Sequence, residues 1–145
     1  MKKILLLLLL TKLILSANNL EIIDPYARAT PPNMKNSAVF MTLKNNTKED
    51  KTIVKASSNV AKFVELHTHN MKNGVMTMYE IPEIKVLANH TTVLKPAGLH
   101  IMLIELNKTL NIGDSIELNL EFEDGTIQSL NVPVKSVAMG MKHHH

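Results

Sequence analysis

Short stretches rich in β-branched and apolar residues, broken repeatedly by turn signals, constrain this chain more than any other feature. Asn73-Gly74, Gly113-Asp114 and Asp124-Gly125 are such signals, because Gly, Asn and Asp tolerate the backbone angles of tight turns. We find no helical period of useful length after residue 17. The pattern predicts an all-β sandwich rather than a barrel. The candidate strands are 21–28, 37–43, 51–56, 61–66, 75–81, 85–87, 91–94, 100–106, 115–122 and 126–132.

The clearest single strand is residues 116–122, in which apolar and polar residues alternate as Ile-Glu-Leu-Asn-Leu-Glu-Phe. Because successive side chains of a strand point to opposite faces, one face should be buried and the other wet. Asp124-Gly125 follows and predicts a hairpin to the next strand.

The first 17 residues predict an exported protein. Met1-Lys2-Lys3 precedes the apolar run 4–10, and the small residues Ser16 and Ala17 close the segment, as in a secretory signal peptide. The run is shorter than the roughly 20 apolar residues of a membrane span. An uncleaved membrane anchor is therefore the less favoured alternative, and we expect no stable membrane insertion after cleavage.

Composition excludes several function classes. The 145 residues include no Cys, which rules out disulfides, thiolate nucleophiles, iron–sulfur clusters and thiolate-ligated blue copper. Removing residues 1–17 takes three of the 16 basic side chains and none of the 13 acidic ones, leaving 13 of each. This balance, with only 3% aromatic residues, argues against a nucleic-acid partner.

Histidine and methionine gather in segments 65–78 and 100–102. Residues two apart on a strand share a face, so His100 and Met102 are expected to project together. A reversal over residues 70–74 would bring the end of the first segment back beside its start. Two imidazoles and two thioethers are then expected to converge at one end of the sandwich. The candidate metal ligands are His67, Met78, His100 and Met102.

These residue types also have simpler roles. Methionine is a flexible filler of hydrophobic cores, and a single histidine on a strand is more often a hydrogen-bonded structural residue. His69, Met71 and Met76 are second-rank candidates, for which packing or solvent exposure is the favoured role. A metal site is therefore expected only from the four residues together, not from any one of them.

The donor set has a clear chemical preference. Thioether sulfur is soft and uncharged and suits Cu(I), and imidazole binds copper through a neutral nitrogen. Zinc sites draw on Cys, His and carboxylates, whereas calcium and magnesium need oxygen. Outside the cytoplasm a thioether has a further advantage, because it cannot form a disulfide. These residues therefore predict a Cu(I) site that weakens in acid, since protonated imidazoles cannot bind.

The spacing of the four residues resembles the signature of the PCu(A)C periplasmic copper chaperones. That signature is a His, ten residues, a Met, twenty-one residues and then His-x-Met, and this chain fits it without insertion or deletion. The flanking stretches Leu94-Lys-Pro96 and Leu99-His-Ile-Met-Leu103 are similar as well. In two departures, Tyr26 stands where the family often has Trp, and Ala97 interrupts what is commonly a Pro-Gly-Gly turn.

The resemblance implies a cupredoxin-like Greek-key β-sandwich that holds Cu(I) near its surface in the periplasm and catalyses no reaction. It implies delivery by ligand exchange toward the copper centres of cytochrome c oxidase, with an oxidase subunit or another copper-delivery protein as acceptor. We expect a signal peptide at 1–17, a copper-binding domain at 18–134 and a Met/His-rich tail at 135–145. The tail, with Met139, Met141 and three terminal histidines, resembles extensions that bind a second copper, including Cu(II).

Two other functions are compatible with an exported β-sandwich. A metal-independent interaction module would present an exposed apolar edge or patch and would ignore copper. A copper-dependent thiol reductase is a third hypothesis, which the missing Cys-x-x-Cys disfavours.

Overall fold

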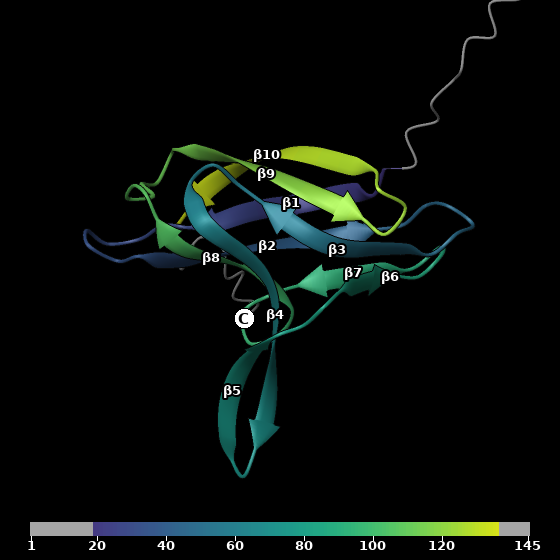
Figure 1. Ribbon diagram of the computed structural model, residues 1–145, viewed down its shortest axis with the longest axis horizontal. Helices are drawn as coiled ribbons and strands as arrows, with labels where there is room; N and C mark the ends of the chain where they lie inside the picture. Colours follow the sequence, from purple (N-terminus) through teal and green to yellow (C-terminus); the bar gives the residue numbers. More distant parts are fainter. Residues whose placement is uncertain (1–18, 137–145) are drawn as a thin grey trace, which may run out of the picture.

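The computed structural model describes residues 19–136, and every regular element in that range is a strand (Figure 1). The expected signal peptide and most of the Met/His-rich tail lie outside the described residues. Residues 19–136 include no helix long and apolar enough to cross a membrane. The strands are β1 (Glu21–Arg28), β2 (Asn36–Lys44), β3 (Lys51–Ser57), β4 (Ala61–Lys72), β5 (Val75–Glu80), β6 (Ile84–Val86), β7 (Thr91–Leu94), β8 (His100–Leu106), β9 (Ser115–Phe122) and β10 (Ile127–Lys135).

The strands form one continuous ladder in the order β5-β4-β8-β2-β1-β10-β9-β3-β6, with β7 paired to β2. All pairs are antiparallel except β1 with β10, a short parallel pair that joins the two halves of the ladder. Buried side chains from both halves, such as Ile101 of β8 and Leu118 of β9, belong to one hydrophobic cluster. The predicted all-β sandwich is therefore confirmed, with its core between the two layers.

Alternation in β9 has the expected result. Ile116, Leu118, Leu120 and Phe122 are buried in the core, whereas the intervening side chains are exposed or half-buried. Asp124 and Gly125 lie in the turn that returns the chain into β10, which pairs with β9 along its length. Burial of one face of each strand thus fixes the register of this layer.

The hairpin of β4 and β5 departs from the prediction. The sequence pattern ended the first strand at Leu66, which is wrong, because β4 continues to Lys72 through pairing with β5. Asn73 and Gly74 form a two-residue connection in which both φ angles are positive, 51° and 75°, as in a type I′ turn. The far part of the hairpin projects away from the sandwich (Figure 1). Met78 lies on β5 of this hairpin, and its side chain is exposed.

Candidate metal centre

The expected ligands lie on the outer face of the layer that contains β5, β4, β8 and β2. In β8, Ile101 and Leu103 are fully buried in the core, so His100 and Met102 point to the opposite face. His100 is nevertheless only 2% exposed. Neighbouring rings on that side cover it: its centroid lies 5.0 Å from that of His69, 5.7 Å from His67 and 6.2 Å from Phe40.

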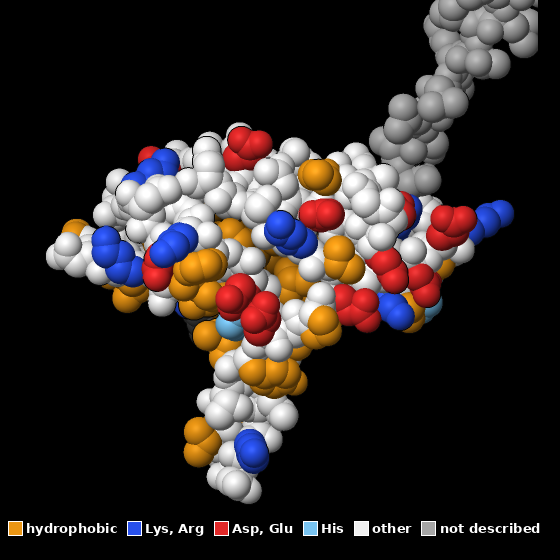
Figure 2. Space-filling view, viewed as in Figure 1, with side chains coloured by type: hydrophobic (Ala, Val, Ile, Leu, Met, Phe, Trp, Pro, Cys, Tyr) orange, Lys and Arg blue, Asp and Glu red, His pale blue; other side chains and the backbone are white. Residues whose placement is uncertain are grey.

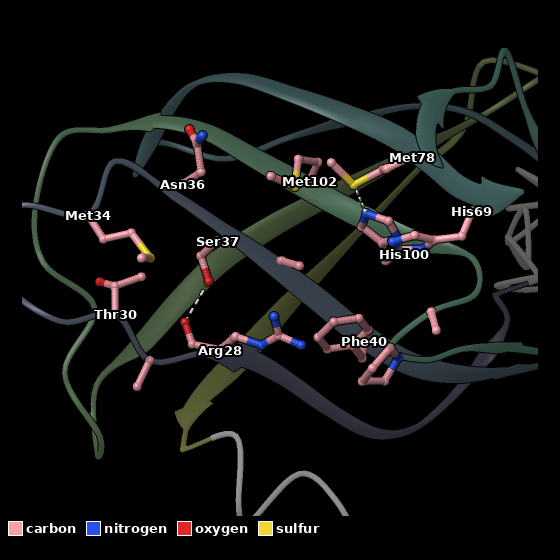
Figure 3. Close-up of a pocket in the computed structure, with 14 residues that line it drawn as sticks. Arg28, Thr30, Met34, Asn36, Ser37, Phe40, His69, Met78, His100 and Met102 are labelled. Carbon is pink, nitrogen blue, oxygen red and sulfur yellow. Dashed lines mark hydrogen bonds between the residues drawn. The ribbon is translucent and has the colours of Figure 1, made fainter. Parts of the chain in front are cut away.

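Met78 lies in direct contact with His100. The Nε2 atom of His100 is 3.0 Å from the Sδ atom of Met78, although 21 residues separate them in the chain (Figure 3). The Nδ1 atom of His100 lies 3.0 Å from the carbonyl oxygen of Gly98. Because a carbonyl only accepts, Nδ1 carries the proton in the neutral ring, and Nε2 has the free lone pair. That lone pair faces the thioether, as two donors to one metal ion would.

Three of the four expected ligands line one cavity of about 360 Å³: Met78, His100 and Met102. In Figure 3 the two methionines lie on the same side of the His100 ring. The fourth, His67, does not line this cavity. His67 lies directly opposite His100 in the pairing of β4 with β8, so the two side chains share a face and His67 flanks the cavity.

His67 is held by a carboxylate that the sequence analysis did not single out. The Nε2 atom of His67 lies 2.7 Å from an Oε atom of Glu65, and the imidazole is 8% exposed. Its other nitrogen, Nδ1, is buried and has no hydrogen-bond partner within the described residues. A buried nitrogen without a partner is costly, and a metal ion would satisfy it. The spacing could have predicted this contact, because residues 65 and 67 lie on the same face of the strand.

Two further donors reach the cavity. His69, which the sequence ranks second, lines it, and its Nδ1 lies 3.2 Å from the same Gly98 oxygen that holds His100. His69 is two residues after His67, so the two side chains were expected on the same face of the strand. Met34 also lines the cavity, from the loop between β1 and β2, where no strand periodicity could have indicated it.

The environment favours the neutral form of His100. Burial lowers the pKa of His100 from its ordinary value of 6.5, against the opposing effect of the hydrogen bond to Gly98. The nearby His69, His67 and Arg28 lower that pKa further. The guanidinium of Arg28 is placed on this side by its contact with the Phe40 ring, 5.2 Å from the centroid. At neutral pH the ring is therefore uncharged and able to bind a metal.

Nitrogen and oxygen donors alone do not make a site here. Among residues 19–136, no group of three or more His, Cys, Asp or Glu side chains is arranged to hold a metal ion. The thioethers of Met78 and Met102 lie beside His100 in the cavity and are further candidate donors. Such a mixed set favours a soft cation.

Comparison with known proteins identifies the family of this chain. The model of the LpqE-like family matches residues 20–134. A relative from Leifsonia xyli subsp. xyli, named "Putative lipoprotein Lxx21020", is 33% identical over 120 residues, which are 82% of this chain and 71% of the relative. The chain belongs to the LpqE-like family.

Solved structures connect this LpqE-like chain with PCuAC domains. The solution structure of the Cu(I) form of DR1885 from Deinococcus radiodurans has 28% identity and a TM-score of 0.66, over 83% of either chain. The copper-bound PCuAC domain of PmoF2 has 18% identity and a TM-score of 0.68, over 81% of this chain and 93% of that domain. The expected resemblance to the PCu(A)C family and the cupredoxin-like β fold are both confirmed.

Proposed function

We propose that this protein is a Cu(I)-binding metallochaperone whose ligands are His67, Met78, His100 and Met102. The observation that carries the proposal is the 3.0 Å contact between the free Nε2 of His100 and the sulfur of Met78. A neutral nitrogen and a thioether both present lone pairs there, and a soft cation would bridge them. The likeness to the Cu(I) form of DR1885 supports the choice of metal.

The remaining two proposed ligands are Met102 and His67. Met102 lines the same cavity as Met78 and His100. His67 offers its unpartnered Nδ1, while Glu65 accepts a hydrogen bond from the protonated Nε2. A carboxylate on the distal nitrogen of a metal-binding imidazole fixes the ring and makes it a better donor.

Differences in exposure explain how copper would leave. Met78 is 44% exposed on the projecting hairpin, whereas His67 and His100 are buried. An acceptor would therefore displace Met78 first and take copper while the imidazoles still hold it. Because all four ligands are neutral, the exchange needs no proton transfer at neutral pH, and we infer no catalysed reaction.

The cellular role follows from the same resemblance. The signal-like residues 1–17 and the "lipoprotein" name of the Leifsonia relative support export. We place the protein in the periplasm, where it would pass copper toward the copper centres of cytochrome c oxidase. The acceptor would be an oxidase subunit or another copper-delivery protein, and a Met/His-rich tail with Cu(II) remains part of the proposal.

Competition for Cu(I) with a coloured chelator under reducing, anaerobic conditions tests the proposal. The protein should take up one tight equivalent, and Met78→Leu or His100→Ala should weaken it by more than about tenfold, since each removes one of four donors. Met41→Leu, in the core, and His90→Gln, at an exposed position, are matched controls that should bind as the parent does. Unchanged affinity in both site variants would refute the proposal.

The same titration separates the metal-independent interaction module. Strand β5 lies at an edge of the ladder and all six of its residues are exposed, as such a module would need. Indifference to copper in the parent protein would favour that function. If the parent protein bound one tight equivalent of Cu(I) and Met78→Leu lost it, a metal-independent interaction module would not explain the site.

A further inference from the structure

The β4–β5 hairpin carries its soft donors on one face. Beyond the body of the sandwich, Met71 lies directly opposite Met76, and the next pair on that face is His69 with Met78. Directly opposite side chains have Cβ atoms about 5 Å apart, and successive pairs on one face lie about 7 Å apart along the strands. The face thus presents a row of sulfur and imidazole donors that leads toward His100.

The other face of the same hairpin carries no sulfur or imidazole donor between residues 68 and 79. Its pairs are Thr68 with Tyr79, Asn70 with Thr77 and Lys72 with Val75. Since the two faces alternate residue by residue, one face collects every His and Met of residues 68–79. This segregation points to a function of the face.

Core packing does not account for Met71 and Met76. Their exposed fractions are 61% and 50%, and neither belongs to the hydrophobic core. In Figure 2 the hairpin stands clear of the body, with hydrophobic side chains exposed on it. The gap-filling role that usually explains a methionine therefore does not apply.

We infer that Met71 and Met76 form a second, weaker Cu(I) site that loads and unloads the buried one. This inference rests on the proposed function. Two opposed thioethers can hold Cu(I) without a charge to neutralise, and their exposure lets a partner's donors reach the ion. Because the pair lacks imidazole and burial, it holds copper less tightly than His100 and its neighbours do.

His69 and Met78 connect the two positions. Since the Gly98 oxygen faces the Nδ1 atom of His69, the proton of its neutral ring lies there and Nε2 has the lone pair. Copper moves inward as bonds to the Met71 and Met76 sulfurs break and bonds to Met78 and the imidazoles form. The ion stays Cu(I) throughout, so neither electrons nor protons are transferred.

The methionine ε-methyl signals in a ¹H–¹³C NMR titration with Cu(I), under reductant, test this directly. The first equivalent should shift Met78 and Met102 together with the His100 ring. Further Cu(I) should then shift Met71 and Met76. These signals are specific to each residue, so copper bound by the tail does not obscure them.

Two variants complete the design. Met71→Leu with Met76→Leu should leave the first equivalent intact and slow the release of Cu(I) to a chelator severalfold. Adding Lys72→Met and Val75→Met to that pair restores two thioethers, on the opposite face. If the position of the donors matters, this variant should still release Cu(I) to the chelator more slowly than the parent protein does.

The outcomes distinguish the two levels of the argument. If Met71 and Met76 stay unshifted with excess Cu(I) while His100 responds, the second site is refuted and the proposed function survives. The loading role would also be refuted if the double variant released Cu(I) at the parent rate. It would be refuted as well if the opposite-face variant regained the parent rate of release. If the His100 and Met78 signals do not respond, the proposed function itself fails.

Discussion

Each nitrogen of the buried histidine pair has a defined task. In His100, Nδ1 is held by the Gly98 carbonyl and Nε2 faces the sulfur of Met78. In His67, Nε2 is held by Glu65, which leaves Nδ1 buried without a partner among residues 19–136. One nitrogen of each ring therefore orients the imidazole, and the other is the one that would bind the proposed metal ion.

Glu65→Gln tests the orienting contact. The amide keeps the size of the side chain but loses the charge that strengthens the His67 nitrogen as a donor. We expect Cu(I) affinity to fall by about 10- to 100-fold, the usual effect of removing such a partner. Competition with a chelator measures it, and Glu105→Gln, an exposed carboxylate on β8, is the control. Affinity equal to that of the parent would contradict the role assigned to Glu65.

Acid should weaken Cu(I) binding, because protons compete for the same nitrogens. Burial lowers the pKa of His100 below 6.5, so its protonation sets in below the ordinary range of histidine. We therefore expect affinity to be nearly constant at neutral pH and to fall only in solution more acidic than the ordinary histidine pKa of 6.5. The measurement is the chelator competition repeated across pH, with a chelator calibrated at each value. Affinity that stays flat into strongly acidic solution would contradict imidazole ligation.

The loop between β7 and β8 is the element that organises the site. Strand β2 pairs with β8 over its first half and with β7 over its second, so residues 95–99 bulge out at the junction. A hydrogen bond from the Gly98 amide to the Lys95 carbonyl closes the turn. The Gly98 carbonyl then faces both His69 and His100. Ala97 adopts φ 65° to make this possible.

Ala97→Gly should stabilise the protein. An Ala in the left-handed backbone conformation destabilises the folded state by about 1–2 kcal/mol, and Gly would remove this strain. Gly also gives the unfolded chain more conformational freedom, which favours unfolding by about 0.4–1 kcal/mol. We expect a net gain of between zero and about 1.5 kcal/mol by chemical denaturation, with Cu(I) affinity unchanged.

Gly74→Ala is the opposite substitution and the comparison for Ala97→Gly. Gly74 has φ 75° and no atom within 4 Å of an added Cβ, so only the backbone conformation resists the change. We expect about 1 kcal/mol less protection of the hairpin amides from hydrogen exchange. If Ala97→Gly destabilised the fold while Gly74→Ala stabilised the hairpin, the positive φ angles would be wrong.

At the scale of the whole molecule, the proposed site depends on strands that are distant in the sequence being neighbours in the sheet. β4 supplies His67, β5 supplies Met78 and β8 supplies His100 and Met102, all on the outer face of one layer. The core lies on the other face and fixes the order of those strands. The proposed ligand exchange would thus take place at the surface without disturbing the packing of the core.

Most strand positions could be predicted from the sequence, because alternation and turn residues are local signals. The shared face of His100 and Met102 followed from spacing in the same way. Three features could not be predicted. The length of β4 depends on its pairing with β5, the register places Met78 opposite His69, and the cavity reaches Met34 through a loop. Each depends on contacts between residues far apart in the chain.

X-ray absorption at the copper edge, on protein loaded with one equivalent of Cu(I), tests the central claim most directly. The account predicts a first shell of two nitrogen and two sulfur donors, with one sulfur lost in Met78→Leu and one nitrogen lost in His100→Ala. A shell of nitrogen and oxygen alone, or a spectrum that neither substitution changes, would contradict it.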